Sequence, residues 1–144
     1  MAIGGGIHHR LEKFVFNPMF RTALRLGFAP RAFALLETIG RRSGQPRMTP
    51  VGNGLDGDVF WLVSEHGTNG AYVKNLIANP EVRIKIGRRW RTGTATVLKD
   101  DDALGRRRDI DDANGLIGRA DGVIFRASAS QPATVRIDLH PVPR

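Results

Sequence analysis

The feature that most constrains the fold is a series of short apolar segments, bounded by glycine, proline or asparagine, from residue 32 onward. Residues 81–86 read EVRIKI and residues 133–141 read ATVRIDLHP, so apolar and polar side chains alternate along both segments. An alternation with a period of two is typical of a strand that buries one face. Comparable segments lie at 33–39, 48–55, 58–65 and 90–98, which predicts about six strands in total.

Turn signals between the segments favour antiparallel pairing. Asp56-Gly57 is a hairpin signal, because glycine takes positive φ without steric cost. Helical patterns are expected at 10–28, 71–80 and 99–119, and a short strand or loop at 121–127. Together these elements predict a mainly β (α+β) domain whose strands close or nearly close into a barrel. We expect a single domain over 1–144, with an N-terminal helical segment at 1–31 and the barrel at 32–144.

Positive charge is concentrated in the first third of the chain. The formal net charge is +8, and residues 1–50 carry eight Lys or Arg against two acidic residues. Such a field favours an anionic partner: a phosphorylated small molecule, nucleic acid or an anionic membrane. There is no cysteine, and the four histidines lack helical metal-ligand spacing, so no metal site is predicted.

The strongest candidate binding site is the turn GRRSGQPR at residues 40–47. Arg41, Arg42 and Arg47 offer guanidinium groups that grip phosphate oxygens, and Ser43 adds a hydroxyl donor. Glycines on both sides let backbone N–H groups approach an anion closely. A solvated basic turn remains the alternative. The turn contains no aromatic residue, so nucleic acid is an improbable partner.

A second candidate is the glycine-rich loop that precedes the predicted helix at 71–80, because a helix N-terminus can hold a ligand. The neighbours Glu65 and His66 invite an acid–base proposal. Adjacent residues on a strand point to opposite faces, so we expect no hydrogen bond between them and assign no catalytic residue. The aspartates at 100–102, 109, 111 and 112 are expected to form a solvated face.

The motif GRRSGQPR, followed by TPV, DGD, LVSEHG and AYVKNLIANPEVRIKIG, resembles the deazaflavin (F420)-dependent nitroreductase family over residues 34–98. That family belongs to the flavin/deazaflavin oxidoreductases with a split β-barrel fold. The resemblance implies coenzyme F420, an 8-hydroxy-5-deazaflavin with an anionic tail, as the cofactor. By this resemblance the phosphate and tail would be held by Arg41, Arg42, Ser43 and Arg47. The deazaflavin ring would be lined by Met48, Thr49, Pro50, Val51, Gly52, Val63, Ser64 and Glu65, and closed in by Ala71, Tyr72, Val73, Lys74 and Asn75.

The resemblance also implies an activity: hydride transfer between a reduced deazaflavin and an electrophilic small molecule such as an enone, a quinone, or an activated alkene or nitro compound. The cofactor carries the hydride, so no catalytic side chain is needed. The alternatives are an FMN-binding split barrel and a non-catalytic cofactor-binding protein. The sequence departs from the family at Glu65, where a basic residue is common, and at Tyr72, where tryptophan is common. It also lacks a tyrosine in its last third.

Two further expectations concern assembly and location. Split barrels of this superfamily are commonly homodimers, and we carry that over as an expectation. We expect a cytoplasmic protein, because no apolar run approaches the roughly 20 residues of a membrane span. Phenylalanines and arginines within 10–28 allow peripheral membrane contact through the N-terminal segment, or packing of that segment on the barrel or a dimer core.

Overall fold

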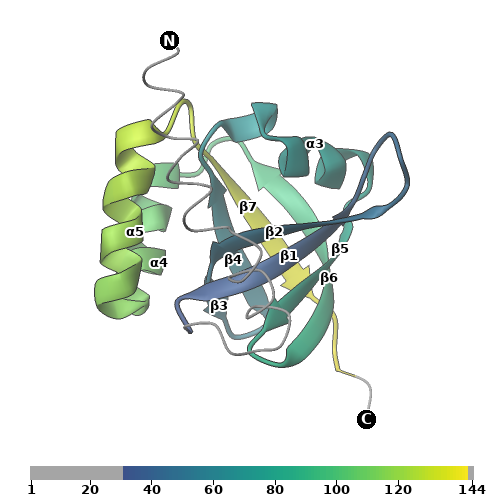
Figure 1. Cartoon of the computed structure of the whole chain (residues 1–144), viewed down its shortest axis with the longest axis horizontal. Helices are drawn as coiled ribbons and strands as arrows, with labels where there is room; N and C mark the ends of the chain where they lie inside the picture. The colour runs from purple at the N-terminus through teal and green to yellow at the C-terminus, as the bar shows by residue number, and fades with distance from the viewer. Residues whose placement is uncertain (1–30, 143–144) are drawn as a thin grey trace.

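The computed structural model describes residues 31–142, which form one antiparallel sheet of seven strands. Along the chain these are β1 (Phe33–Ile39), β2 (Pro46–Gly52), β3 (Leu55–Asp56), β4 (Val59–Ser64), β5 (Glu81–Ile86), β6 (Arg89–Leu98) and β7 (Ala133–Leu139). Their order in the sheet is β2-β1-β5-β6-β7-β4-β3. The sheet curls until β1 and β2 cross over β4 (Figure 1). The predicted mainly β class is therefore confirmed, and the two-residue β3 is the strand beyond the expected six.

The inside of the curl is the main core. Alternation places the apolar residues there: in β5, Val82 and Ile84 are buried while Glu81 and Arg83 are exposed. The largest side chain of this core, Phe60 in β4, has no exposed surface. Burial of such side chains contributes about 1.5–3 kcal/mol each, so this inner face is what keeps the sheet curled.

Three α-helices cover the described part of the sheet, after a 3-10 turn η1 (Gly67–Asn69). Helix α3 (Ala71–Ala78) packs on β1 and β6 and inserts Val73 and Leu76 into the core. Helices α4 (Ala103–Ala113) and α5 (Gly115–Ser128) pack on each other, with α4 against β4, at one side of the barrel (Figure 1). Asp102 caps α4, because its Oδ1 accepts a hydrogen bond from the Gly105 N–H at 3.1 Å.

The structure corrects two expectations. The predicted strand at 48–55 is divided: β2 ends at Gly52 and pairs with β1, whereas β3 forms a separate hairpin with β4. The stretch at 121–127 is helical, as part of α5. The glycines of α5 have a packing role, since a Cβ on Gly118 would lie 2.5 Å from the Asp111 carbonyl oxygen. Glycine at this position lets α5 lie close to α4.

The predicted helical segment at 10–28 lies outside the described residues. Within residues 31–142, no helix combines the length and apolarity needed to cross a membrane.

Candidate functional site

A cavity of about 360 Å³ opens where the two edges of the curled sheet face each other. One wall is β2, from Met48 to Gly52, and the other is the end of β4 with the Glu65–His66 turn. The start of α3 closes one end, and side chains of α4 and α5 close the remaining side. This volume lies within the range of small-molecule and cofactor sites.

The β2 wall offers backbone groups to a ligand. The strand pairs with β1 alone, so it is an edge of the sheet. Backbone N–H and C=O groups along the free side of an edge strand have no partner within the sheet. Pro50 lacks an N–H group, which fits its place on an edge strand. The free edge can therefore hydrogen-bond a flat heterocycle that carries both carbonyl and N–H groups.

A hydroxyl pair lies on the opposite wall. Ser64 is buried at the end of β4, and its Oγ donates a hydrogen bond to the Gly67 carbonyl at 2.9 Å. Tyr72, at the start of α3, lines the cavity beside Ser64. Burial raises the pKa of Tyr72 to about 12, against the smaller opposing effects of the Ser64 hydrogen bond and the Arg107 charge. The phenol is therefore a neutral hydrogen-bonding group at physiological pH.

The pKa of Tyr72 can be measured directly, because the chain has a single tyrosine. We expect tyrosinate absorbance at 295 nm to appear with a midpoint near pH 12 in the folded protein, and near pH 10 when urea unfolds it. Because folding raises this pKa, the associated stability is present below pH 10 and is lost as the pH rises toward 12. A folded-state midpoint equal to that in urea would contradict the burial of this hydroxyl.

The basic turn is tied to α3 by Asn75. The Oδ1 atom of Asn75 accepts hydrogen bonds from the Arg41 backbone N–H at 3.2 Å and from Arg41 Nη1 at 3.0 Å. Its Nδ2 donates to Thr38 Oγ1 at 3.3 Å. Arg41 Nη1 also reaches the carbonyl of Ala71, a residue that lines the cavity. Arg41 and Asn75 therefore fix the turn beside the cavity rather than line it.

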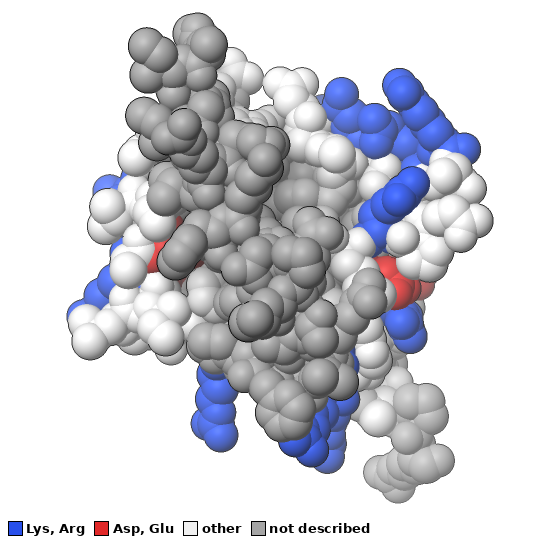
Figure 2. All heavy atoms as spheres, viewed as in Figure 1, with Lys and Arg blue, Asp and Glu red and all other residues white. Residues whose placement is uncertain are grey.

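The other residues of the turn face solvent. Ser43 Oγ accepts hydrogen bonds from the Gln45 N–H at 3.1 Å and from Arg47 Nη2 at 3.4 Å. Arg42 and Arg47 are exposed. Figure 2 shows Lys and Arg side chains gathered at the rim where Figure 1 places the β1–β2 turn. Because Arg47 directly precedes the Met48 wall, this rim can hold an anionic group attached to a ligand inside the cavity.

The structure thus divides the predicted residues into two groups. The cavity is lined by Met48, Thr49, Pro50, Val51, Gly52, Val63, Ser64, Glu65, Ala71 and Tyr72. Outside it lie the exposed Lys74 and the core residue Val73, together with Arg41, Arg42, Ser43, Arg47 and Asn75 of the turn and its anchor. That any of them binds a cofactor stays a prediction.

The expectation that Glu65 and His66 lie on a strand and point to opposite faces is wrong. The two residues lie in the turn after β4 rather than on the strand. His66 Nε2 is 3.4 Å from Glu65 Oε2, and both residues line the cavity. The opposite-face rule fails here because it applies only to extended backbone.

Sequence reasoning missed the wall formed by the helices. It consists of Arg107, Ile110, Asp121, Ile124 and Phe125, with Phe33 from β1 nearby. Positions 107 and 110 are three residues apart in α4, so they lie on one face of that helix. Positions 124 and 125 follow 121 by three and four residues in α5, so these three also share a face. That periodicity could have indicated a buried wall, but the high charge of the segment favoured the interpretation that its side chains face solvent.

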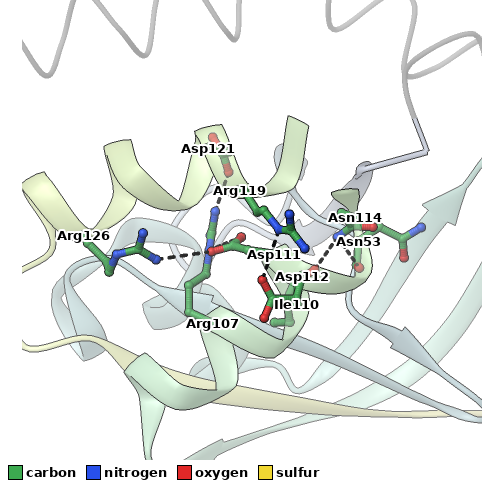
Figure 3. Close-up of polar contacts among 9 residues, drawn as sticks. All are labelled: Asn53, Arg107, Ile110, Asp111, Asp112, Asn114, Arg119, Asp121 and Arg126. Carbon is green, nitrogen blue, oxygen red and sulfur yellow. Dashed lines mark hydrogen bonds and ion pairs between the residues drawn. The ribbon is translucent and has the colours of Figure 1, made fainter. Parts of the chain in front are cut away.

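A buried ion-pair network holds this wall together (Figure 3). Arg107 is 7% exposed; its Nε donates to Asp111 Oδ1 at 2.9 Å and its Nη2 donates to Asp121. Asp111 is 3% exposed, and burial raises its pKa, with the Arg107 charge opposing the shift. Arg126 Nη1 lies 4.0 Å from Asp111 Oδ2, which has no hydrogen-bond partner among residues 31–142. The prediction of a solvated face is thus wrong for Asp111. Asp109 and Asp112, by contrast, are exposed.

Comparison with known proteins gives the family. A family model described as F420H(2)-dependent quinone reductase matches residues 21–114. An F420H(2)-dependent quinone reductase of Mycobacterium tuberculosis H37Rv is 36% identical over 70 residues, which cover 46% of this chain and 46% of that protein. The chain therefore spans about half the length of the curated relatives that it matches.

Solved structures give the fold. An F420-H2 dependent reductase (FDR-A) aligns with a TM-score of 0.55 and 18% identity, over 75% of this chain and 95% of that one. A domain-swapped dimer aligns with a TM-score of 0.57 and 17% identity, over 83% and 93% of the two chains. These likenesses confirm the split-barrel fold, and the family match confirms the resemblance seen in the motifs. The chain belongs to the F420H(2)-dependent quinone reductase family.

Proposed function

We propose that this protein is an F420H2-dependent oxidoreductase that reduces a quinone-type electrophile. The cofactor would be coenzyme F420, with its ring in the cavity and its anionic tail on the basic turn. The family match and the activity for which the 36%-identical relative is named support this assignment. When bound, the reduced deazaflavin supplies a hydride, and the chain binds, orients and shields the reactants.

The observation that carries the proposal is the continuity between the free β2 edge and the basic turn. Arg47 belongs to β2, and the next five residues line the cavity. A ring with carbonyl and N–H groups fits the edge backbone, and a phosphorylated polyglutamate tail fits the exposed Arg42, Arg47 and Lys74. The residues present therefore fit the cofactor in shape and charge.

The other wall suits a flat apolar acceptor. Leu62, Ile110, Ile124 and Phe125 contribute apolar surface opposite the β2 edge. A ring placed there would lie against a cofactor on β2 with little water between the two, which suits hydride transfer. A quinone has this shape, and its carbonyl oxygens can take hydrogen bonds from the polar groups among the lining residues.

We also propose a homodimer, in line with the superfamily expectation and with the dimeric neighbour of similar fold. The cytoplasmic location likewise stays a prediction. Peripheral membrane contact through 10–28 concerns residues outside those described.

The experiment that tests the proposal is titration of the purified protein with F420 and, separately, with FMN. We expect micromolar or tighter binding of F420 and much weaker binding of FMN. Arg42→Ala and Arg47→Ala should each weaken F420 binding about 10-fold, the loss of one charge-assisted contact of about 1.5 kcal/mol. Arg108→Ala, at an exposed arginine on α4, is the matched control and should change binding less than about twofold.

The two cofactors separate the outcomes. Tight FMN binding in place of F420 would move the protein to the FMN alternative. Binding of neither cofactor would overturn the oxidoreductase assignment. With F420 bound, oxidation of F420H2 by quinones, followed by the return of deazaflavin absorbance, completes the test.

A further inference from the structure

Arg107 presents unused hydrogen-bond donors at the cavity. Its Nε and Nη2 groups are engaged by Asp111 and Asp121, whereas Nη1 has no hydrogen-bond partner among the described residues. The guanidinium carbon lies 4.4 Å from the centre of the Phe125 ring, and both residues line the cavity. The charge of Arg107 also acts on the Tyr72 hydroxyl across the cavity. Arg107 thus brings donors that neither carboxylate takes to the wall of the cavity.

A purely structural role explains this arrangement poorly. Ion pairs buried between helices are often no more stabilising than apolar side chains of similar volume, because each charge loses its hydration. This loss of hydration is incompletely compensated here, since one oxygen of Asp111 is buried without a hydrogen bond. Two carboxylates (Figure 3) and the face of the Phe125 ring do, however, fix a guanidinium in one orientation. Fixed orientation is what a group needs if it must stabilise charge that develops during a reaction.

We propose that Arg107 positions the acceptor in the cavity and stabilises the negative charge that forms on its oxygen. This inference rests on the proposed function. A quinone that accepts a hydride gains two electrons and one hydrogen and becomes a hydroquinone monoanion; a proton from water then gives the neutral hydroquinone. The reduced deazaflavin loses the hydride and one proton in the same turnover, so atoms and electrons balance. The Nη1 N–H groups donate to the anionic oxygen.

The charged groups around Arg107 determine whether it stabilises the anion by net charge or by directed hydrogen bonds. Asp111 and Asp121 contact it directly, Arg126 faces Asp111 at 4.0 Å, and Glu65 lines the same cavity. The two arginines balance the two aspartates, so the network brings little net charge. The effect therefore comes from directed N–H donors, and it should be sensitive to the geometry of the side chain at 107.

The test compares Arg107→Gln with Arg108→Gln. Both changes remove a guanidinium from α4, but Arg108 is exposed and does not line the cavity. For Arg107→Gln we expect kcat for quinone reduction to fall about 100-fold, as when one oxyanion donor is lost. F420 affinity measured by titration should stay within about twofold, and Arg108→Gln should keep wild-type kcat. If Arg107→Gln fails to fold, the double variant Arg107→Gln/Asp111→Asn, which removes both charges, replaces it.

A series of quinones separates stabilisation of the anion from a structural role. We expect the loss of kcat in the variant to grow as the hydroquinone becomes a weaker acid, because a more basic anion gains more from the lost donors. An unchanged kcat, or a loss equal for every quinone, would overturn the inference. A wild-type protein that binds F420 but reduces no quinone would instead overturn the proposed function, and this inference with it.

Discussion

Replacing Gly54 with alanine is expected to lower the free energy of unfolding by about 3 kcal/mol or more. A Cβ on Gly54 would lie 1.7 Å from the Trp61 carbonyl oxygen, whereas the Gly54 carbonyl accepts the Trp61 N–H at 2.9 Å. Both clashing groups belong to the backbone or are fixed to it, so no change of rotamer relieves the overlap. The chain must move at the point where it leaves β2 and starts β3.

Urea unfolding followed by circular dichroism measures this effect, and Gly57→Ala is the matched control. Gly57 lies in the next turn with φ of 61° and open space around its Cβ position. Alanine there should cost only about 1 kcal/mol, the strain of positive φ. Equal losses for the two variants would show that conformational freedom, rather than close approach to Trp61, determines the need for Gly54.

The close approach of Gly54 to Trp61 belongs to the part of the fold that the sequence could not predict, whereas most strands could be predicted from local patterns. Strand β1 was predicted from a continuous apolar run, and consecutive side chains of it are indeed buried. Strands β5 and β7 were predicted from alternation about one buried face, β7 with two residues more than it has. The division between β2 and β3 depends on two distant segments: Asn53 N donates to the Ala32 carbonyl just before β1, and the Gly54 carbonyl accepts the N–H of Trp61 in β4. A local pattern carries no trace of such pairings, and the segment 48–55 therefore looked like one strand.

The candidate site shows a similar limit. The wall from β2, β4 and the start of α3 came from contiguous motifs, which a family resemblance preserves. The wall from α4 and α5 did not, because the burial of Arg107 and Asp111 follows from the packing of one helix on the other. Read alone, the segment 99–119 is strongly charged, and such segments are usually solvated. Only the tertiary contact converts these charges into a buried network.

Replacing Asn75 with leucine is expected to weaken F420 binding about 30-fold or more and to destabilise the protein by about 3 kcal/mol. The change removes two hydrogen bonds that Asn75 accepts from Arg41 and one that it donates to Thr38. Thr38 is 1% exposed, so its hydroxyl would be left buried without this partner. Each buried group without a partner costs about 1–3 kcal/mol. The basic turn would also lose its anchor beside the cavity, and its arginines would no longer be fixed to receive the cofactor tail.

The measurement pairs F420 titration with urea unfolding, and Ile77→Ala on the exposed side of α3 serves as the control, since Ile77 is 56% exposed. The control should change both quantities little. If Asn75→Leu lowers stability but leaves F420 affinity unchanged, the turn does not act through its anchorage to α3. In that case the exposed Arg42 and Arg47 alone would hold the anionic tail. A joint loss of affinity and stability would instead show that the buried amide of Asn75 links the folding of the barrel to the binding of its cofactor. The same side chain then supports the packing of α3 on β1 and sets the position of the basic turn.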